Sequence, residues 1–130
     1  MLVFASFSGC LVVVLGAMGA HLLREHFHLP EHNLQVYETA VRYQAYHTLA
    51  LFILSLWVIH YPSKWGEWSG KLFLSGIFIF SGSLYFLALR PLFGLSDDQL
   101  KWIGALTPLG GLAFIGGWIC LLVFALKLQK

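Results

Sequence analysis

The chain alternates between long apolar stretches and short polar stretches. Lys, Arg, Asp and Glu are absent from four runs of 23, 21, 18 and 25 residues, which are residues 1–23, 43–63, 72–89 and 102–126. Each run is long enough to cross the roughly 30 Å hydrocarbon core of a membrane as an α-helix. Apolar and polar residues do not alternate within the runs, as they would in the strands of a membrane β-barrel. The pattern therefore predicts an all-α integral membrane protein.

The predicted fold is four transmembrane helices in an antiparallel bundle, which form a single domain over residues 1–130. The expected spans are about 2–23, 43–61, 72–89 and 102–126. Pro30 followed by Glu31 is typical of a helix start, and nothing breaks the helix before about His60. A helix of that length exceeds the thickness of the hydrocarbon core. We therefore expect its first half to lie in the interface or to project from it.

The composition excludes several classes of protein. Of the 130 residues 58% are hydrophobic and 11% are charged, and the mean hydropathy is +0.76. A water-soluble domain has about a quarter of its residues charged. The net charge of +2 gives no basic face, so we expect no nucleic-acid partner. The first run lacks the Lys or Arg that precedes the apolar core of a signal peptide, which favours a retained span over a cleaved segment.

The loops give little information about orientation. Four spans place both termini on one side of the membrane. The Lys and Arg residues then divide equally, with Lys64, Lys71, Lys127 and Lys130 on the side of the termini and Arg24, Arg42, Arg90 and Lys101 on the other. Five of the six acids lie opposite the termini, which favours an N-in, C-in topology. In the third loop, residues 96–99 read Ser-Asp-Asp-Gln, a capping box that would start the fourth helix.

Small residues recur on particular faces of the predicted helices. In lipid, such residues let two helix backbones approach closely. The residues assigned to helix packing are Gly9, Gly16, Ala20, Gly82, Gly104, Pro108, Gly111 and Gly117. Two faces of the fourth helix carry small residues, which predicts close neighbours on both of its sides. Pro108 cannot donate a backbone hydrogen bond and should kink that helix. The carbonyl that it frees would be satisfied by a hydroxyl such as that of Thr107, or would bind an ion.

The second predicted helix carries the candidate functional cluster. An ionisable residue within a span is costly and usually faces the interior of the bundle. His47 is the one such residue clearly inside a charge-free run. The cluster that we assign on and near its face is His47, Gln44, Tyr43, Thr39, Arg42, Glu38 and His21, with Glu38 and Arg42 spaced for an i,i+4 ion pair. A hydrogen-bonded imidazole would be structural, whereas one in a wet cleft would relay protons.

No pattern of residues points to a catalytic or metal centre. Four histidines lie within twelve residues, but Pro30 interrupts their helical spacing and no cysteine or carboxylate pattern joins them. Nucleophile elbows, phosphate loops and paired carboxylates are absent from the sequence. We therefore expect no enzyme activity, no metal and no cofactor.

Four sequence blocks resemble those of a known family. The blocks are residues 16–21 (Gly-Ala-Met-Gly-Ala-His), residues 37–50 (from Tyr37 to Ala50), residues 80–85 (Phe-Ser-Gly-Ser-Leu-Tyr) and residues 107–111 (Thr-Pro-Leu-Gly-Gly). They resemble the uncharacterised family called domain of unknown function 423, which comprises YgdD-like and YwdK-like bacterial proteins and has transmembrane protein 256 as a eukaryotic relative. The resemblance covers nearly the whole chain and implies a multi-pass protein of the bacterial cytoplasmic membrane. It supplies no activity and no catalytic residue.

Three hypotheses of function follow. The first is a non-enzymatic packing or interaction protein whose partners are membrane lipids, other copies of itself or another membrane protein. The second is a small transporter or channel with a polar route near His47 and Pro108. The third, an integral membrane enzyme that uses His21 or His47, requires a cleft that reaches those rings from the interface.

Overall fold

The computed structural model describes residues 1–96 and 100–129, and every regular element in them is helical. The helices group into four rods. The first rod is α1 (Leu2–Ala17) continued by η1 (Met18–His26), and the second is α2 (Glu31–His60). The third consists of α3 (Lys64–Gly76), η2 (Ile77–Ser81), α4 (Gly82–Leu89) and the short η3 (Arg90–Phe93), and the fourth is α5 (Lys101–Leu128).

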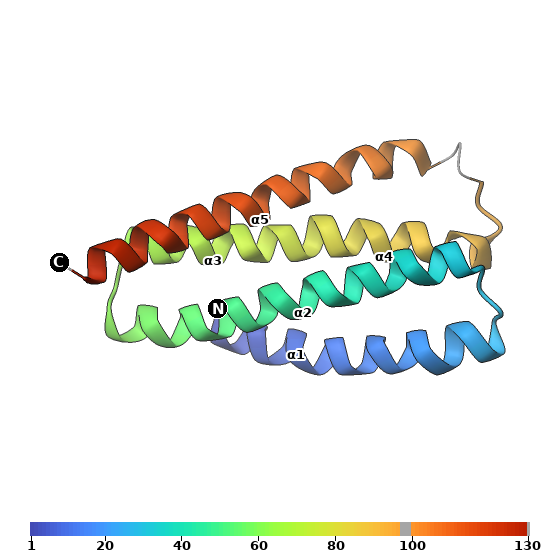
Figure 1. Ribbon diagram of the computed structural model, residues 1–130, viewed down its shortest axis with the longest axis horizontal. Coiled ribbons are helices and arrows are strands. Elements are labelled where there is room, and N and C mark those ends of the chain that lie inside the picture. Colours follow the sequence, from blue (N-terminus) through green and yellow to red (C-terminus); the bar gives the residue numbers. More distant parts are fainter. Residues whose placement is uncertain (97–99, 130) are drawn as a thin grey trace.

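Successive rods lie side by side and run in opposite directions (Figure 1). The α1 rod packs on α2, α2 packs on the α3–α4 rod, and α5 packs on the far side of that rod. Side chains of α2 and α5 also meet, among them His47 and Trp118. The start of α1 and the end of α5 lie toward the end of the molecule where α2 joins α3 (Figure 1).

Within residues 1–96 and 100–129, three helical segments have the length and composition to cross a membrane. They are Leu2–His26, Lys64–Phe93 and Lys101–Leu128. The α2 helix begins and ends as expected from the sequence, but it is not among these three. The charge-free residues 43–60 at its end include Gln44, His47 and His60, whose polarity makes this stretch less hydropathic than the three segments above.

Two apolar clusters lie between the rods. The larger one brings together α2, α3, η2 and α5 through Leu51, Leu54, Phe73, Ile77 and Phe114. The smaller one covers the turn between η1 and α2, and its members are Leu23, Leu29, Leu34, Tyr37 and Ala88. The side chains that face outward are also largely apolar, as the lipid-contacting surface of a membrane protein should be.

Glycines on one face of α5 permit its closest contact with the third rod. A Cβ atom placed on Gly110 would lie 2.8 Å from Phe80 Cα, and one on Gly117 would lie 2.6 Å from the ring of Phe73. Gly76 of α3 faces the ring of Phe114 in the same way. At Gly110 the neighbour is backbone, which cannot move aside as a side chain can, so this contact requires a residue without a side chain.

The second small face of α5 is open at Gly104 and Pro108. A Cβ atom on Gly104 would have no neighbour within 4 Å, and Pro108 is exposed. Gly82 in α4 is similarly open, and Ala20 is exposed. The expectation of close neighbours on both sides of α5 was wrong, because its backbone packs closely on the third rod. It meets α2 through side chains such as Trp118 and Phe114.

The remaining small residues make ordinary contacts. Cβ atoms on Gly9 and Gly16 would lie 4.0 Å from Thr48 and 3.9 Å from Val41 of α2, and one on Gly111 would lie 3.8 Å from Phe80.

Of the two features predicted for the start and middle of the last helix, only the proline can be compared with the structure. The capping box at residues 96–99 includes residues 97–99, which lie outside the described part of the chain. Pro108 lies within α5, which continues on both sides of it from Lys101 to Leu128. Thr107 Oγ1 donates to the carbonyl of Ile103 at 3.4 Å rather than to that of Gly104.

Replacing Gly110 by Ala should destabilise the protein, because the new methyl group would meet the backbone of Phe80. We expect a loss of about 1–3 kcal/mol in the free energy of unfolding. The measurement is unfolding in mixed micelles titrated with sodium dodecyl sulfate. Gly104→Ala is the matched control on the same helix and should be neutral or stabilising by up to about 1 kcal/mol, because Ala favours helix. Equal effects of the two substitutions would contradict the close contact.

Candidate functional site

Four polar side chains form a connected cluster inside the protein. Gln44 Nε2 donates to Ser8 Oγ at 3.1 Å, and Ser8 Oγ lies 2.7 Å from Thr48 Oγ1. The hydroxyl of Tyr85 donates to Gln44 Oε1 at 2.8 Å. We call Ser8, Gln44, Thr48 and Tyr85 the buried polar cluster. It joins α1, α2 and α4, because Gln44 and Thr48 are one turn apart on α2 and face both neighbours.

His47 lies on the adjacent face of α2 and uses both of its ring nitrogens. Nδ1 lies 2.7 Å from the carbonyl oxygen of Tyr43, and Trp118 Nε1 of α5 lies 3.2 Å from Nε2. An indole N–H can only donate, so Nε2 must accept and Nδ1 must carry the proton. The imidazole is therefore neutral in this arrangement. It stacks on the ring of Phe114, with a distance of 3.5 Å between ring centroids.

This pairing restricts what His47 can do chemically. A metal ligand or a general base needs a free nitrogen lone pair, and the only lone pair in the ring plane accepts from Trp118. Protonation at Nε2 would place two N–H groups against each other and would break the link to α5. The side chain is 5% exposed, so water has little access to the ring.

Two hydroxyl groups fasten the outer rod α5 to the third rod. Ser83 Oγ lies 2.7 Å from Thr107 Oγ1, and Ser69 Oγ donates to the carbonyl of Gly117 at 2.9 Å. The first contact lies one residue before Pro108. Together with the bond between Trp118 and His47, these contacts give α5 polar attachments along its length.

The seven residues of the predicted cluster do not converge on one site. Gln44 and His47 are buried, whereas Arg42 is exposed and Tyr43 contributes its backbone carbonyl to His47. Thr39 Oγ1 donates to the carbonyl of Gln35 in its own helix at 2.8 Å.

The charged members of the predicted cluster form contacts at the surface. Glu38 pairs with Arg24 of η1 at 3.3 Å. The prediction of an i,i+4 ion pair between Glu38 and Arg42 was therefore wrong. Arg24 extends from the neighbouring rod into reach of Glu38, and it also lies 3.9 Å from Glu31. His21 is exposed and lies 3.8 Å from Glu25, away from His47.

Several residues of the site were not singled out from the sequence. They are Ser8, Thr48, Tyr85, Ser83 and Trp118. All lie within charge-free runs, and Thr48, Ser83 and Tyr85 fall in the blocks that carry the family resemblance. A search for every hydrogen-bonding side chain within a span, rather than for ionisable ones alone, would have found them.

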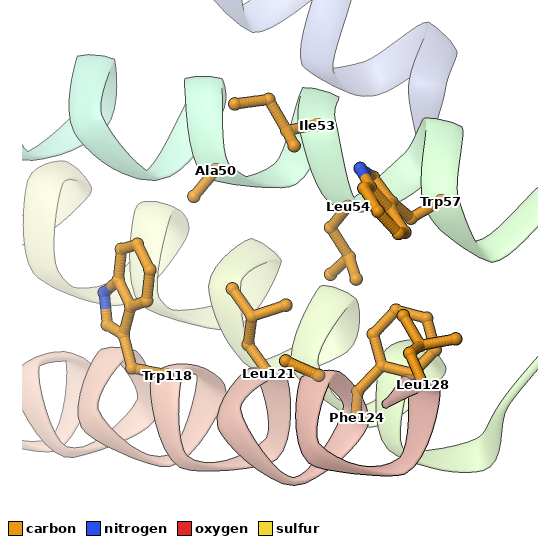
Figure 2. A pocket seen from close by; sticks show the side chains of 9 residues that line it. Ala50, Ile53, Leu54, Trp57, Trp118, Leu121, Phe124 and Leu128 are labelled. Atoms are coloured by element: carbon orange, nitrogen blue, oxygen red, sulfur yellow. The ribbon is translucent and has the colours of Figure 1, made fainter. Parts of the chain in front are cut away.

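An apolar groove opens between α2 and α5 next to His47 (Figure 2). Its volume is about 300 Å³. The lining residues are Ala50, Ile53, Leu54, Trp57, Trp118, Leu121, Phe124, Ala125 and Leu128. Trp118 thus serves two structures, because its indole N–H binds His47 while its ring lies at one end of the groove (Figure 2).

Comparison with known proteins identifies the family. The model of the family described as "Protein of unknown function (DUF423)" matches residues 15–111. The chain belongs to the DUF423 family. The matched segment holds Gln44, His47 and Tyr85, although Ser8 and Trp118 lie outside it. No solved structure matches the chain.

Several similar proteins align over nearly the whole chain. UPF0382 inner membrane protein YgdD of Escherichia coli (strain K12) is 38% identical over 130 residues, which are 100% of this chain and 92% of the relative. UPF0382 membrane protein YwdK of Bacillus subtilis (strain 168) is 40% identical over 128 residues, 97% of this chain and 95% of the relative. UPF0382 membrane protein SAB0533 of Staphylococcus aureus is 38% identical over 126 residues, which are 97% of this chain and 94% of the relative.

These relatives and the apolar helices agree on location. The chain is a multi-pass integral protein of the bacterial inner membrane, from a family whose molecular function is unknown.

Removing the hydrogen bond between Gln44 and Tyr85 tests the buried polar cluster. A double-mutant cycle of Gln44→Leu and Tyr85→Phe, measured by unfolding in mixed micelles, should give a coupling energy of about 0.6–1.7 kcal/mol, the range found for such bonds in membranes. Tyr61→Phe at the exposed end of α2 provides the control, which should be additive with Gln44→Leu within about 0.5 kcal/mol. A coupling near zero for Gln44 and Tyr85 would mean that the bond does not form.

Proposed function

We propose that this protein is a four-span, non-enzymatic membrane protein that binds a transmembrane helix of a partner in the groove between α2 and α5. The proposal has α2 as the fourth span and both termini in the cytoplasm. Residues 43–61 of α2 are free of charge, and their outward side chains Leu49, Phe52, Ile53 and Leu56 are exposed apolar groups. Such a surface is suited to lipid contact. The first half of α2 would then lie at the interface.

We propose that the protein is not an enzyme because most of its interior polar groups are paired with one another. Ser81 Oγ is the exception among the described residues, since it is buried without a hydrogen-bond partner. Gln44, Ser8, Thr48 and Tyr85 bond to one another, and His47 bonds to Tyr43 and Trp118. An enzyme keeps a reactive group free to meet its substrate. The pairing of these side chains with one another favours a structural role for them.

The observation that carries the proposal is the double role of Trp118. Its bond to His47 fixes the indole ring at one end of the groove, while Trp57 lies toward the other end (Figure 2). A binding surface benefits from rigid aromatic walls, because little conformational entropy is lost when a partner docks. In this account His47 is a positioning residue for the groove.

A helix suits the groove because of its small residues. Ala50 lines the groove from α2, and Ala125 lines it from α5. Their small side chains leave space between the two helices at these positions. Small residues on lipid-facing surfaces allow a further helix backbone to approach closely. An acyl chain is the competing occupant, and the experiment below distinguishes the two.

The transporter alternative receives less support from the geometry. Its route would pass His47 and Pro108, but the lone pair of the imidazole is occupied by Trp118 and the ring is stacked on Phe114. Pro108 is exposed on the outer surface of α5 rather than facing His47. A route through this region would require α2 and α5 to separate.

A photo-crosslinking amino acid placed at Ile53, in the groove, tests the proposed binding. In native membranes we expect one discrete protein adduct, whose partner is identified by peptide mass spectrometry. The further substitution Ala125→Phe fills the groove and should reduce this adduct at least fivefold. Ala105→Phe adds the same ring at an exposed position of the same helix and should leave the adduct intact. Adducts with lipid alone, or equal effects of the two Phe substitutions, would overturn the proposal.

A further inference from the structure

A second cleft lies on another side of α5, between α5 and α3. It is lined by Lys64, Trp65, Trp68 and Leu72 of α3 and by Cys120 of α5, and its volume is about 460 Å³. This cleft differs in chemistry from the groove between α2 and α5. One end carries a lysine and two indole rings, and the rest is apolar.

Three lysines surround the aromatic end of the cleft. Lys127 Nζ of α5 lies 5.5 Å from the ring centroid of Trp65, and Lys71 Nζ lies 5.1 Å from that of Trp68. Lys64 lines the cleft itself. Within the described residues, no ion pair joins any of these lysines to an acid, although Glu67 lies in the same turn of α3. The ammonium groups of Lys71 and Lys127 are held by contacts with indole faces, which leaves their charge available to an anion.

The change from charged to apolar along the cleft coincides with the edge of the membrane core. On α3 the charge-free run begins at Leu72, directly after Lys71, and on α5 it ends at residue 126, directly before Lys127. Both helices belong to segments able to cross a membrane. The lysines and indole rings therefore lie at headgroup depth, whereas Leu72 and Cys120 lie at the depth of acyl chains.

We propose that this cleft is a binding site for an anionic phospholipid. The phosphate lies between the ammonium groups of Lys64 and Lys127, and one acyl chain follows Trp68, Leu72 and Cys120 into the membrane. Basic residues between helix ends are suited to anionic headgroups, and the adjoining apolar wall accepts the chain. A zwitterionic lipid has its own cation beside the phosphate and gains less from the lysines. The site is separate from the groove and does not depend on the proposed binding of a helix.

The test is titration of the purified, delipidated full-length protein in detergent with dioleoyl phosphatidylglycerol. Native mass spectrometry measures the one-to-one complex, and dioleoyl phosphatidylcholine serves as the zwitterionic comparison. We expect Lys127→Gln to weaken phosphatidylglycerol binding about fivefold, as befits one lysine at a membrane surface. Lys101→Gln makes the same change of charge at the opposite end of α5 and should alter binding less than twofold.

A second variant tests the apolar half of the site without changing charge. Cys120→Phe fills the chain-binding part of the cleft and should also weaken phosphatidylglycerol binding at least fivefold, with circular dichroism confirming that the variant is folded. Ala125→Phe, on the groove side of the same helix, should leave lipid binding unchanged. The proposal is overturned if Lys127→Gln and Lys101→Gln weaken binding equally, if Cys120→Phe has no effect while folded, or if phosphatidylcholine binds as tightly as phosphatidylglycerol.

Discussion

The lack of hydrogen-bonding partners in the hydrocarbon core is the constraint on which this structure depends. A polar side chain at membrane depth is costly unless it finds a partner within the protein, because lipid tails offer none. Gln44 has an amide with both donors and an acceptor, and it meets this requirement through Ser8 on one neighbouring rod and Tyr85 on another. His47 meets it through the carbonyl of Tyr43 in its own helix and through Trp118 of α5. The polar side chains of α2 therefore select its neighbours and fix its rotation.

Close packing between helices adds to the hydrogen bonds in holding the rods together. No hydrophobic effect drives helices together within lipid, so contact area and polar bonds must hold α5 in place. Gly110 and Gly117 bring it against Phe80 and Phe73, and Ser69 binds the carbonyl of Gly117 at the same contact. One consequence reaches the surface, because the bond that satisfies His47 also holds the indole at one end of the α2–α5 groove. Trp118 therefore provides the hydrogen bond that His47 needs and also shapes the groove on the surface.

The helices were predictable from the sequence because they depend on local composition. Charge-free runs locate α1, α5 and the α3–α4 rod, and the Pro30-Glu31 pair marks the start of α2. The partners of each side chain depend on how the helices are rotated about their axes, which local composition does not determine. Hence Gly104 was assigned to packing but faces outward, and Glu38 was paired with Arg42 but binds Arg24. His47 and Gln44 stood out because they are strongly polar, whereas Ser8 and Tyr85 became recognisable only once α1 and α4 were placed beside α2.

The central claim is that His47 is a neutral, doubly bonded ring that joins α2 to α5. Nitrogen-15 NMR of histidine-labelled protein in lipid nanodiscs at pH 7.5 tests it most directly, with the resonance assigned by its loss in His47→Gln. The account predicts a single neutral tautomer protonated at Nδ1, with an Nε2 shift that moves when Trp118 is replaced by Phe. A ring protonated at Nε2, an imidazolium, or a spectrum unaffected by Trp118→Phe would contradict the account.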